Sequence, residues 1–208
     1  MKKSKKKPYS KAVICRGMKA SPTQLAITGS SGCGKTTLMK ILEENLRAVG
    51  YVFASGGKIT RELQVELGYK TIGEFVRFLA GQADQKYDRE IDQRLINLAK
   101  HMPQFVLEAR LAHVFVPNGF KVLLTCPLAV RAERVCGKSG GRAFEKACKE
   151  LQERDRKDRE RNQRRNPGCI WRHKDFDLVL STEKHSPREL FGKIVAGHAV
   201  WLKKHGKF

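Results

Sequence analysis

A glycine-rich loop between two apolar runs constrains this chain more than any other feature. The stretch LAITGSSGCGKTTLMKIL, residues 25–42, contains the pattern G-x-x-x-x-G-K-[ST]. A strand before the loop and a helix after it are the context this pattern requires, because backbone N–H groups then surround a phosphate at the helix N-terminus. A chance glycine-rich turn is the alternative, and the flanking strand and helix argue against it. The loop therefore predicts binding of a nucleoside triphosphate.

Individual residues of the loop have expected roles. Lys35 is expected to reach the transferred phosphoryl group, and the hydroxyl of Thr36 to be a ligand of Mg²⁺. Cys33 is expected to fill space, with a redox-active thiol as the less favoured alternative. The residues expected to surround the nucleotide are Gly29, Ser30, Ser31, Gly32, Cys33, Gly34, Lys35, Thr36 and Thr37.

Apolar runs alternate with helical patterns along the rest of the chain. The runs typical of buried strands are 24–28, 51–55, 104–109, 121–126 and 177–181. Helical spacing of apolar residues follows the loop and recurs at about 61–68, 71–80, 86–100, 129–136, 144–165 and 186–202. Five short strands separated by helices predict an α/β protein with the P-loop NTPase fold, a five-stranded parallel sheet with helices on both faces.

The chain is strongly basic. Its formal charge is +21, from 42 basic and 21 acidic side chains, and six of the lysines fall within the first eleven residues. Such a charge predicts attraction to polyanions but does not choose among nucleotides, nucleic acid and anionic surfaces. Residues 1–20 are expected to form a flexible basic arm, with a single domain over 21–208.

Composition excludes several classes of protein. A hydrophobic content of 40% argues against a disordered chain, and no apolar run approaches the ~20 residues needed to span a membrane. The basic N-terminus is not followed by the apolar stretch of a secretory signal. Six cysteines without a C-x-x-C pair indicate neither a zinc site nor a disulfide framework. A cytoplasmic, monomeric protein with reduced thiols is expected.

A second anion site is expected at the carboxyl edge of the sheet, where open α/β sheets bind ligands. Ser55 ends one predicted strand, and Arg61 lies on the helix after it. Glu108 and Arg110 end another strand. Each arginine alone would more commonly be a solvated surface residue, and the convergence of two on one edge favours a site. Glu108 is equally consistent with a carboxylate that holds Mg²⁺ through water and with a surface acid.

The charged stretch ERDRKDRERNQRR, residues 153–165, is expected to be helical. Arg154, Asp158 and Arg161 then share one face. A solvated helix with alternating charges explains the composition of the stretch. Arginines that fold over a triphosphate and neutralise its charge would give the high charge density a function.

These motifs together resemble those of cytidylate kinases of the nucleoside monophosphate kinase family, of the type common in archaea. The resemblance covers about 25–202 and lies in the glycine loop, in SGGKITR, YDREIDQRL, VLEAR and PLAVRAER, and in FDLVLST followed by SP. The stretch 154–161 is also similar to the R-D-x-x-D-x-x-R signature of bacterial cytidylate kinases. No single motif is specific, but their order and spacing are.

The resemblance implies a reaction in which ATP phosphorylates CMP or dCMP. It places the acceptor region at about 55–100 and a helical lid at about 134–170. Acceptor-binding residues would be Ser55, Arg61, Arg110, Asp158 and Arg161, with Asp88, Arg89, Asp92 and Arg94 nearby. Catalytic residues would be Lys35 of the loop together with Arg154, Asp158 and Arg161, the last three between acceptor and donor. Arg134 would contact ATP from the start of the lid.

The chain departs from the family pattern at three places. Ala109 stands where the family has glycine, Asn162 where it has an aromatic residue, and PGCIW replaces a turn that contains tyrosine. A methyl group at Ala109 would narrow the approach to the acceptor phosphate or alter specificity.

Two alternative functions stay open on the sequence. The first is a P-loop kinase for another small nucleotide or metabolite. The second is a P-loop protein that binds RNA or ribosomes and uses ATP as a switch, with nonspecific RNA contact through the lysine arm. Charge favours the second alternative only weakly, because ordered motifs are more specific than charge.

Overall fold

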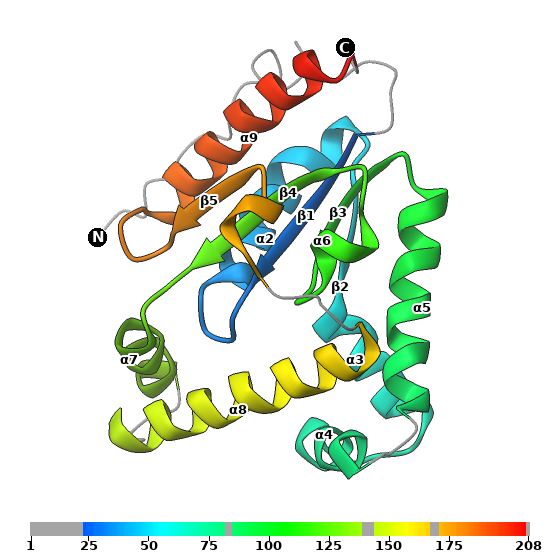
Figure 1. Ribbon diagram of the computed structural model, residues 1–208, viewed down its shortest axis with the longest axis vertical. Coiled ribbons are helices and arrows are strands. Elements are labelled where there is room, and N and C mark those ends of the chain that lie inside the picture. Colours follow the sequence, from blue (N-terminus) through cyan, green and yellow to red (C-terminus); the bar gives the residue numbers. More distant parts are fainter. Residues whose placement is uncertain (1–22, 82–84, 139–143, 167–170, 207–208) are drawn as a thin grey trace, which may run out of the picture.

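A computed structural model describes residues 23–81, 85–138, 144–166 and 171–206 (Figure 1). The basic arm expected over 1–20 lies outside these residues. Within the part of the chain that is described, no helix combines the length and apolarity needed to cross a bilayer.

The centre of the protein is a parallel β-sheet with the strand order β2-β3-β1-β4-β5. Its strands are β1 (Thr23–Gly29), β2 (Val52–Ser55), β3 (Gln104–Glu108), β4 (Phe120–Thr125) and β5 (Leu178–Ser181). The predicted five-stranded parallel sheet is confirmed, and each strand lies within a residue or two of its expected position. Continuous apolar runs identify these strands because both faces of the sheet are covered.

Helices connect successive strands and flank the sheet. They are α2 (Lys35–Leu46), α3 (Gly56–Glu66), α4 (Ile72–Gly81), α5 (Lys86–His101), α6 (Ala112–Phe115), α7 (Leu128–Lys138), α8 (Phe144–Arg165) and α9 (Pro187–Lys204), with short 3₁₀ turns η1 (Arg47–Val49) and η2 (His173–Asp175). Ser186 caps α9 in a capping box with Glu189. This cap satisfies N–H groups that the first helical turn leaves unpaired.

Two apolar cores lie on opposite faces of the sheet. Along β1, Leu25 and Ile27 belong to the core formed with α2 and α9, whereas Ala26 belongs to the core formed with α3, α4, α5 and α6. Along β3, Val106 and Leu107 divide in the same way. The alternation follows from the two-residue period of a strand, and it leaves helices covering both faces.

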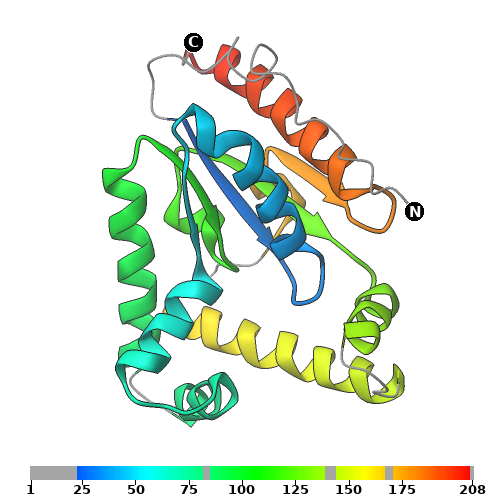
Figure 2. The same cartoon turned by 180° about the vertical axis from the view of Figure 1, so that it is seen from behind.

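Helix α8 lies apart from both cores and crosses the carboxyl ends of the strands. It extends from α7 to the region of α3 and α4 (Figure 1), and the view from behind shows the same arrangement (Figure 2). Its apolar contact with α7 includes a small buried cluster of Ala132, Ala147 and Leu151. The charged helix predicted over 144–165 therefore lies over the edge of the sheet where ligands are expected.

The start of α3 differs from the sequence expectation. Periodicity predicts a helix over about 61–68, but α3 begins at Gly56, immediately after β2. A β-carbon added at Gly56 would lie 3.3 Å from the Cβ of Ala109, so the helix starts where a side chain has little room. Ala109 is buried in the apolar core beside α3. Its methyl group packs there, and the expected effect on the acceptor site or on specificity stays a prediction.

A buried histidine gives the fold a predicted pH dependence. His113 on α6 is 8% exposed, and burial lowers its pKa to about 4, with Lys121 adding to the effect. The folded pKa lies below the ordinary value near 6.5, so the unfolded chain binds the proton more readily between these limits. The stability that neutral His113 provides is therefore complete above about pH 6.5 and is lost as the pH falls toward 4.

We expect protonation of His113 in the unfolded chain to lower the free energy of unfolding by about 2 kcal/mol when the pH falls from 7 to 5. Urea unfolding of the native chain and of His113→Gln at both values measures it. The stability difference between the two proteins should shrink by about that amount at pH 5. A difference that is the same at both pH values would show that His113 does not carry this dependence.

Candidate active site

The glycine loop joins β1 to α2 in the conformation that a phosphate site requires. Gly32 and Gly34 have φ angles of 76° and 94°, in the left-handed region that favours glycine. Gly34 is the N-cap residue of α2, and no side chain caps the helix there. The free N–H groups at this helix end and the positive end of the helix dipole therefore face the loop.

Lys35 lies inside the loop with its ammonium group held by the backbone. Its Nζ donates to the carbonyl oxygens of Gly29 and Ser30 at 2.8 and 2.9 Å and lies 3.7 Å from Oε1 of Glu108. The hydroxyl of Ser55 donates to Oε2 of Glu108 at 2.7 Å. Lys35, Glu108 and Ser55 thus meet at the carboxyl ends of three neighbouring strands, as expected.

The oxygen donors beside Lys35 are of the kind that Mg²⁺ prefers. Glu108 is 12% exposed, so it is not the free surface acid that the sequence left open. Thr36 follows Lys35 at the start of α2. Among the described residues, no three His, Cys, Asp or Glu side chains gather to hold a metal ion. A hydroxyl and one carboxylate fit an ion held jointly with nucleotide phosphates, not a site made of protein ligands alone.

Arg110, which the sequence predicts at the second anion site, contacts the loop. Its Nη2 donates to the Ser31 hydroxyl at 2.7 Å, and its guanidinium forms ion pairs with Asp158 and, at 3.7 Å, with Asp155. Burial lowers the pKa of Arg110, while the Asp158 carboxylate acts in the opposite direction. An arginine held this way can exchange its carboxylate partners for the oxygens of an incoming phosphate.

The face of α8 that points toward the sheet carries both acidic and basic side chains. Arg161 forms an ion pair with the buried Asp88 on α5 and lies 3.8 Å from Asp158. Arg154 is 66% exposed and reaches only the edge of this cluster, 4.0 Å from Asp158. Asp158 and Arg161 therefore lie together as predicted, and Arg154 lies beside them, largely in solvent.

Two further predicted residues flank the loop and the acceptor edge. Arg134 on α7 donates to the hydroxyl and the carbonyl oxygen of Thr182, at 2.9 and 2.7 Å. A β-carbon added at Gly34 would lie 3.7 Å from its Nη1, so Arg134 borders the loop. Arg61 is exposed, and its guanidinium lies on the same side of Gly57 as the Ser55 hydroxyl.

Other predicted residues lie outside the centre of the site. Arg94 on α5 forms ion pairs with Glu66 of α3 and with Glu90 one turn earlier on α5. These three residues form an ion-pair network at the surface. Cys33 is fully buried, and burial raises the pKa of its thiol despite the nearby Lys35. The space-filling interpretation of Cys33 therefore fits its surroundings, whereas a reactive thiolate does not.

Comparison with known proteins identifies the family. The model of the cytidylate kinase-like family matches residues 24–184. The chain belongs to the cytidylate kinase-like family. It is 33% identical to a cytidylate kinase of Pyrococcus furiosus over 83% of this chain and 86% of that protein. It is 30% identical to a cytidylate kinase of Methanobrevibacter smithii over 80% of this chain and 92% of that protein.

A solved structure of lower identity shares the fold of this cytidylate kinase-like chain. A gluconokinase of Sinorhizobium meliloti superposes with a TM-score of 0.52 at 17% identity, over 89% of this chain and 97% of that one. The arrangement of sheet and helices is therefore shared with that gluconokinase.

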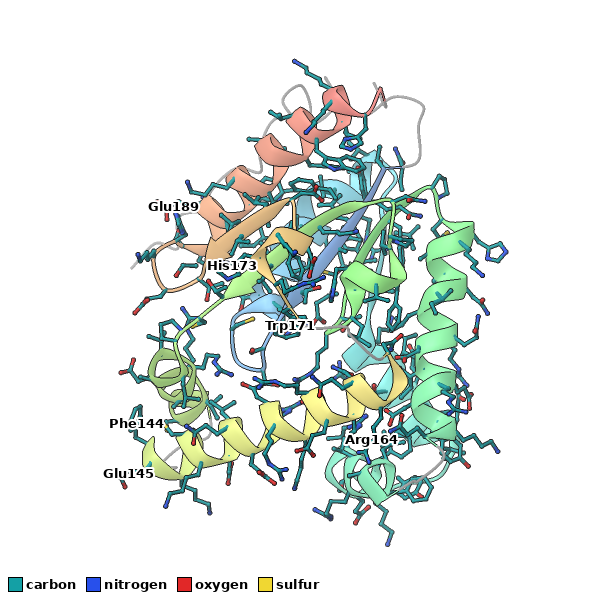
Figure 3. The ribbon with its side chains drawn as sticks, viewed as in Figure 1. Phe144, Glu145, Arg164, Trp171, His173 and Glu189 are labelled. Carbon is teal, nitrogen blue, oxygen red and sulfur yellow. The ribbon has the colours of Figure 1, made fainter. Side chains whose placement is uncertain are left out.

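A cavity of about 430 Å³ opens between the sheet edge and α8 in this cytidylate kinase-like fold. It is lined by Ser30, Arg110, Leu111, Asp155, Arg159, Asn162, Gln163 and Trp171. The indole N–H of Trp171 donates to the carbonyl oxygen of Arg110 at 3.1 Å. Figure 3 shows Trp171 between the strand ends and α8, whose two ends are marked by Phe144 and Arg164.

Four residues of the site were not assigned a role from the sequence. Asp155 and Asp88 are partners of site arginines, Arg131 contacts the loop, and Trp171 lines the cavity. Asp155 precedes Asp158 by three residues, and Arg131 precedes Arg134 by three. A spacing of three residues from an assigned residue on the same helix was therefore the signal that would have identified Asp155 and Arg131.

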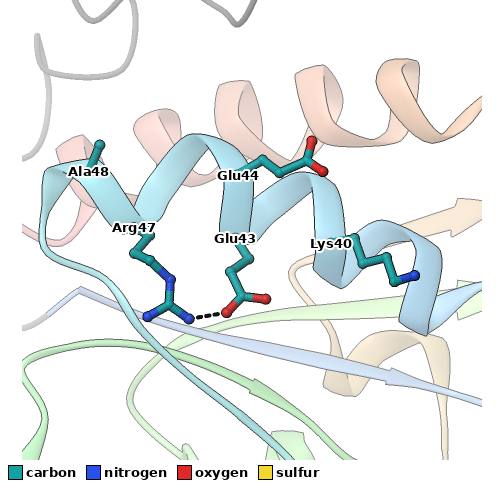
Figure 4. Close-up of a pocket in the computed structure, with 5 residues that line it drawn as sticks. All are labelled: Lys40, Glu43, Glu44, Arg47 and Ala48. Carbon is teal, nitrogen blue, oxygen red and sulfur yellow. Dashed lines mark hydrogen bonds and ion pairs between the residues drawn. The ribbon is translucent and has the colours of Figure 1, made fainter.

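Another hollow, of about 500 Å³, lies on the outer surface of α2 and η1 (Figure 4). Its lining residues are Lys40, Glu43, Glu44, Arg47 and Ala48. Arg47 and Glu43 pair across one helical turn in solvent. None of the site residues described above lines this hollow, and we assign it no role.

Proposed function

We propose that the protein transfers the γ-phosphoryl group of ATP to the phosphate of CMP or dCMP. The single observation that carries the proposal is the hydrogen bond between Arg110 and Ser31 of the glycine loop. Through it, an arginine at the end of β3 lies against the loop that would hold the donor phosphates. Two anion-binding positions in contact are what a transfer between two phosphates requires. The names of the family and of the relatives support a cytidine nucleotide as the acceptor.

The chemistry follows from charge and alignment. An oxygen of the acceptor phosphate attacks the γ-phosphorus, the bond to the β,γ-bridging oxygen breaks, and ADP leaves. The acceptor phosphate is already deprotonated near neutral pH, so no general base is needed. Lys35 exchanges its two carbonyl partners for phosphoryl oxygens, and Arg110 and Arg161 exchange carboxylates for phosphate oxygens. When bound through Thr36 and Glu108, Mg²⁺ neutralises charge on the donor phosphates.

The regions of the chain take corresponding roles. Residues 21–208 form one catalytic domain, in which about 55–100 binds the acceptor and about 134–170 is a lid that contains α8 and the last residues of α7. Ser55, Arg61 and Arg110 bind the acceptor, and Arg134 binds ATP. Arg154, which lies at the solvent-exposed edge, turns inward beside Asp158 and Arg161, between the two substrates, when they bind.

A coupled assay of ADP formation tests this function. ATP and Mg²⁺ are offered with CMP, dCMP, UMP and AMP in turn, and the rates are compared with ATP alone. We expect CMP or dCMP to give the highest kcat/KM. A strong preference for UMP, AMP or another small phosphorylated metabolite would change the acceptor named in the proposal but leave the type of reaction unchanged. ADP formation at the background rate with every acceptor would contradict the proposal.

A further inference from the structure

Arg131 on α7 joins the glycine loop to α8. Its Nη1 donates to the carbonyl oxygen of Ser31 at 3.1 Å and to Oδ2 of Asp155 at 2.7 Å. Both are ordinary hydrogen-bond distances, and the second joins opposite charges. One guanidinium group therefore contacts two elements that lie far apart in the sequence.

Burial makes the partner of Arg131 important. The side chains of Arg131 and Asp155 are 9% and 19% exposed. A guanidinium removed from water in this way is costly unless a carboxylate compensates it. In the described part of the chain, Nε of Arg131 has no hydrogen-bond partner, so the guanidinium relies on its Nη1 contacts. Movement of α8 away from the sheet would remove the carboxylate from Arg131.

The contacts form a closed ring through the loop. Arg131 binds the Ser31 carbonyl oxygen and Asp155, Asp155 lies 3.7 Å from Arg110, and Arg110 donates to the Ser31 hydroxyl. Both arginines of the ring therefore bind the same loop residue, Ser31. Two arginines therefore link α8 to Ser31 of the loop.

We propose that Arg131 is a positioning residue that couples the conformation of the glycine loop to closure of α8. A phosphate in the loop turns backbone N–H groups inward and carbonyl groups outward. The outward carbonyl of Ser31 is the acceptor that holds Arg131 in place for Asp155. A donor nucleotide therefore favours the closed position of α8, and by reciprocity closed α8 favours the nucleotide. The inference rests on the proposed function in one respect, the assignment of α8 to the lid.

The experiment measures hydrogen exchange of the α8 amides in the full chain, with and without AMP-PNP, a nonhydrolysable ATP analogue. In the native protein we expect AMP-PNP to slow exchange over residues 150–160 by about fivefold or more. Asp155→Asn keeps the size of the side chain and removes the charge. This variant should still bind AMP-PNP, with an affinity lowered by no more than about the coupling factor itself, but lose the protection of α8.

Arg156→Gln is the matched control, because Arg156 is the neighbour of Asp155 on α8 but pairs with Glu153 and Glu160 in solvent. It should keep the protection that AMP-PNP induces. Arg131→Lys keeps a positive charge without the guanidinium group and should lose part of the protection. Asp155→Asn alone decides the question if the buried Arg131 does not tolerate substitution.

A purely structural ion pair would give a different result. Asp155→Asn would then speed exchange equally with and without AMP-PNP and leave the nucleotide-induced protection unchanged. That result, or the absence of protection in the native protein, would overturn the coupling. The measurement uses no acceptor. Lack of activity with CMP would therefore overturn the proposed function, whereas the coupling through Arg131 would still be decided by the hydrogen-exchange measurement.

Discussion

Replacing Lys35 with alanine is expected to abolish measurable phosphoryl transfer, a loss in kcat on the order of 10²- to 10³-fold or more. The Nζ of Lys35 lies at the loop, 2.8 and 2.9 Å from the carbonyl oxygens of Gly29 and Ser30. It is the cation that would neutralise charge as the γ-phosphoryl group moves. Initial rates at saturating ATP and CMP measure the loss.

Lys40→Ala is the matched control for this substitution. Lys40 is an exposed lysine of the same helix, on the outer surface shown in Figure 4. Its removal should change kcat by less than about twofold. Thermal unfolding of both variants shows whether either substitution disturbs the loop. A Lys35→Ala protein that folds normally and keeps kcat within about tenfold of native would contradict the assignment of Lys35.

Replacing Arg110 with alanine is expected to raise the KM for CMP on the order of 100-fold, because a buried charge-assisted contact is worth several kcal/mol. The KM for ATP should change by less than about threefold. Steady-state kinetics with each substrate varied in turn separates the two. Arg110→Lys keeps the charge without the planar fork and should fall between alanine and native.

Arg156→Ala is the control for Arg110→Ala. It also removes an arginine, but Arg156 lies on the solvent side of α8 and is 56% exposed. Both Michaelis constants should stay near their native values. An Arg110→Ala protein with an unchanged KM for CMP would remove Arg110 from the acceptor site, even if kcat fell.

The sequence predicted the parts of the fold that depend on local patterns. Apolar runs located all five strands, because both faces of the sheet are buried. Charge and helical spacing located α8, and the Ser186 cap marked the start of α9. The start of α3 was missed because Gly56 and Gly57 carry no side chains that would show a period. The short α6 was missed because four residues give too few turns for a pattern.

The candidate site was predictable at the ends of strands and less so on α8. Ser55 and Glu108 end their strands, and Lys35 and Arg110 follow strand ends closely. The topology of a parallel sheet brings such ends together. Which face of α8 points inward depends on packing against α7, which the sequence does not contain as a local signal. Asp155 therefore lies in the site, while Arg154 extends into solvent.

The most direct test of the central claim follows the transferred phosphate itself. ATP labelled with ³²P at the γ position is incubated with CMP, Mg²⁺ and the protein, and the products are separated. The proposed two-substrate site predicts label in the β-phosphate of CDP, with one ADP formed for each CDP. Release of the label only as inorganic phosphate, with CMP recovered unchanged, would contradict it.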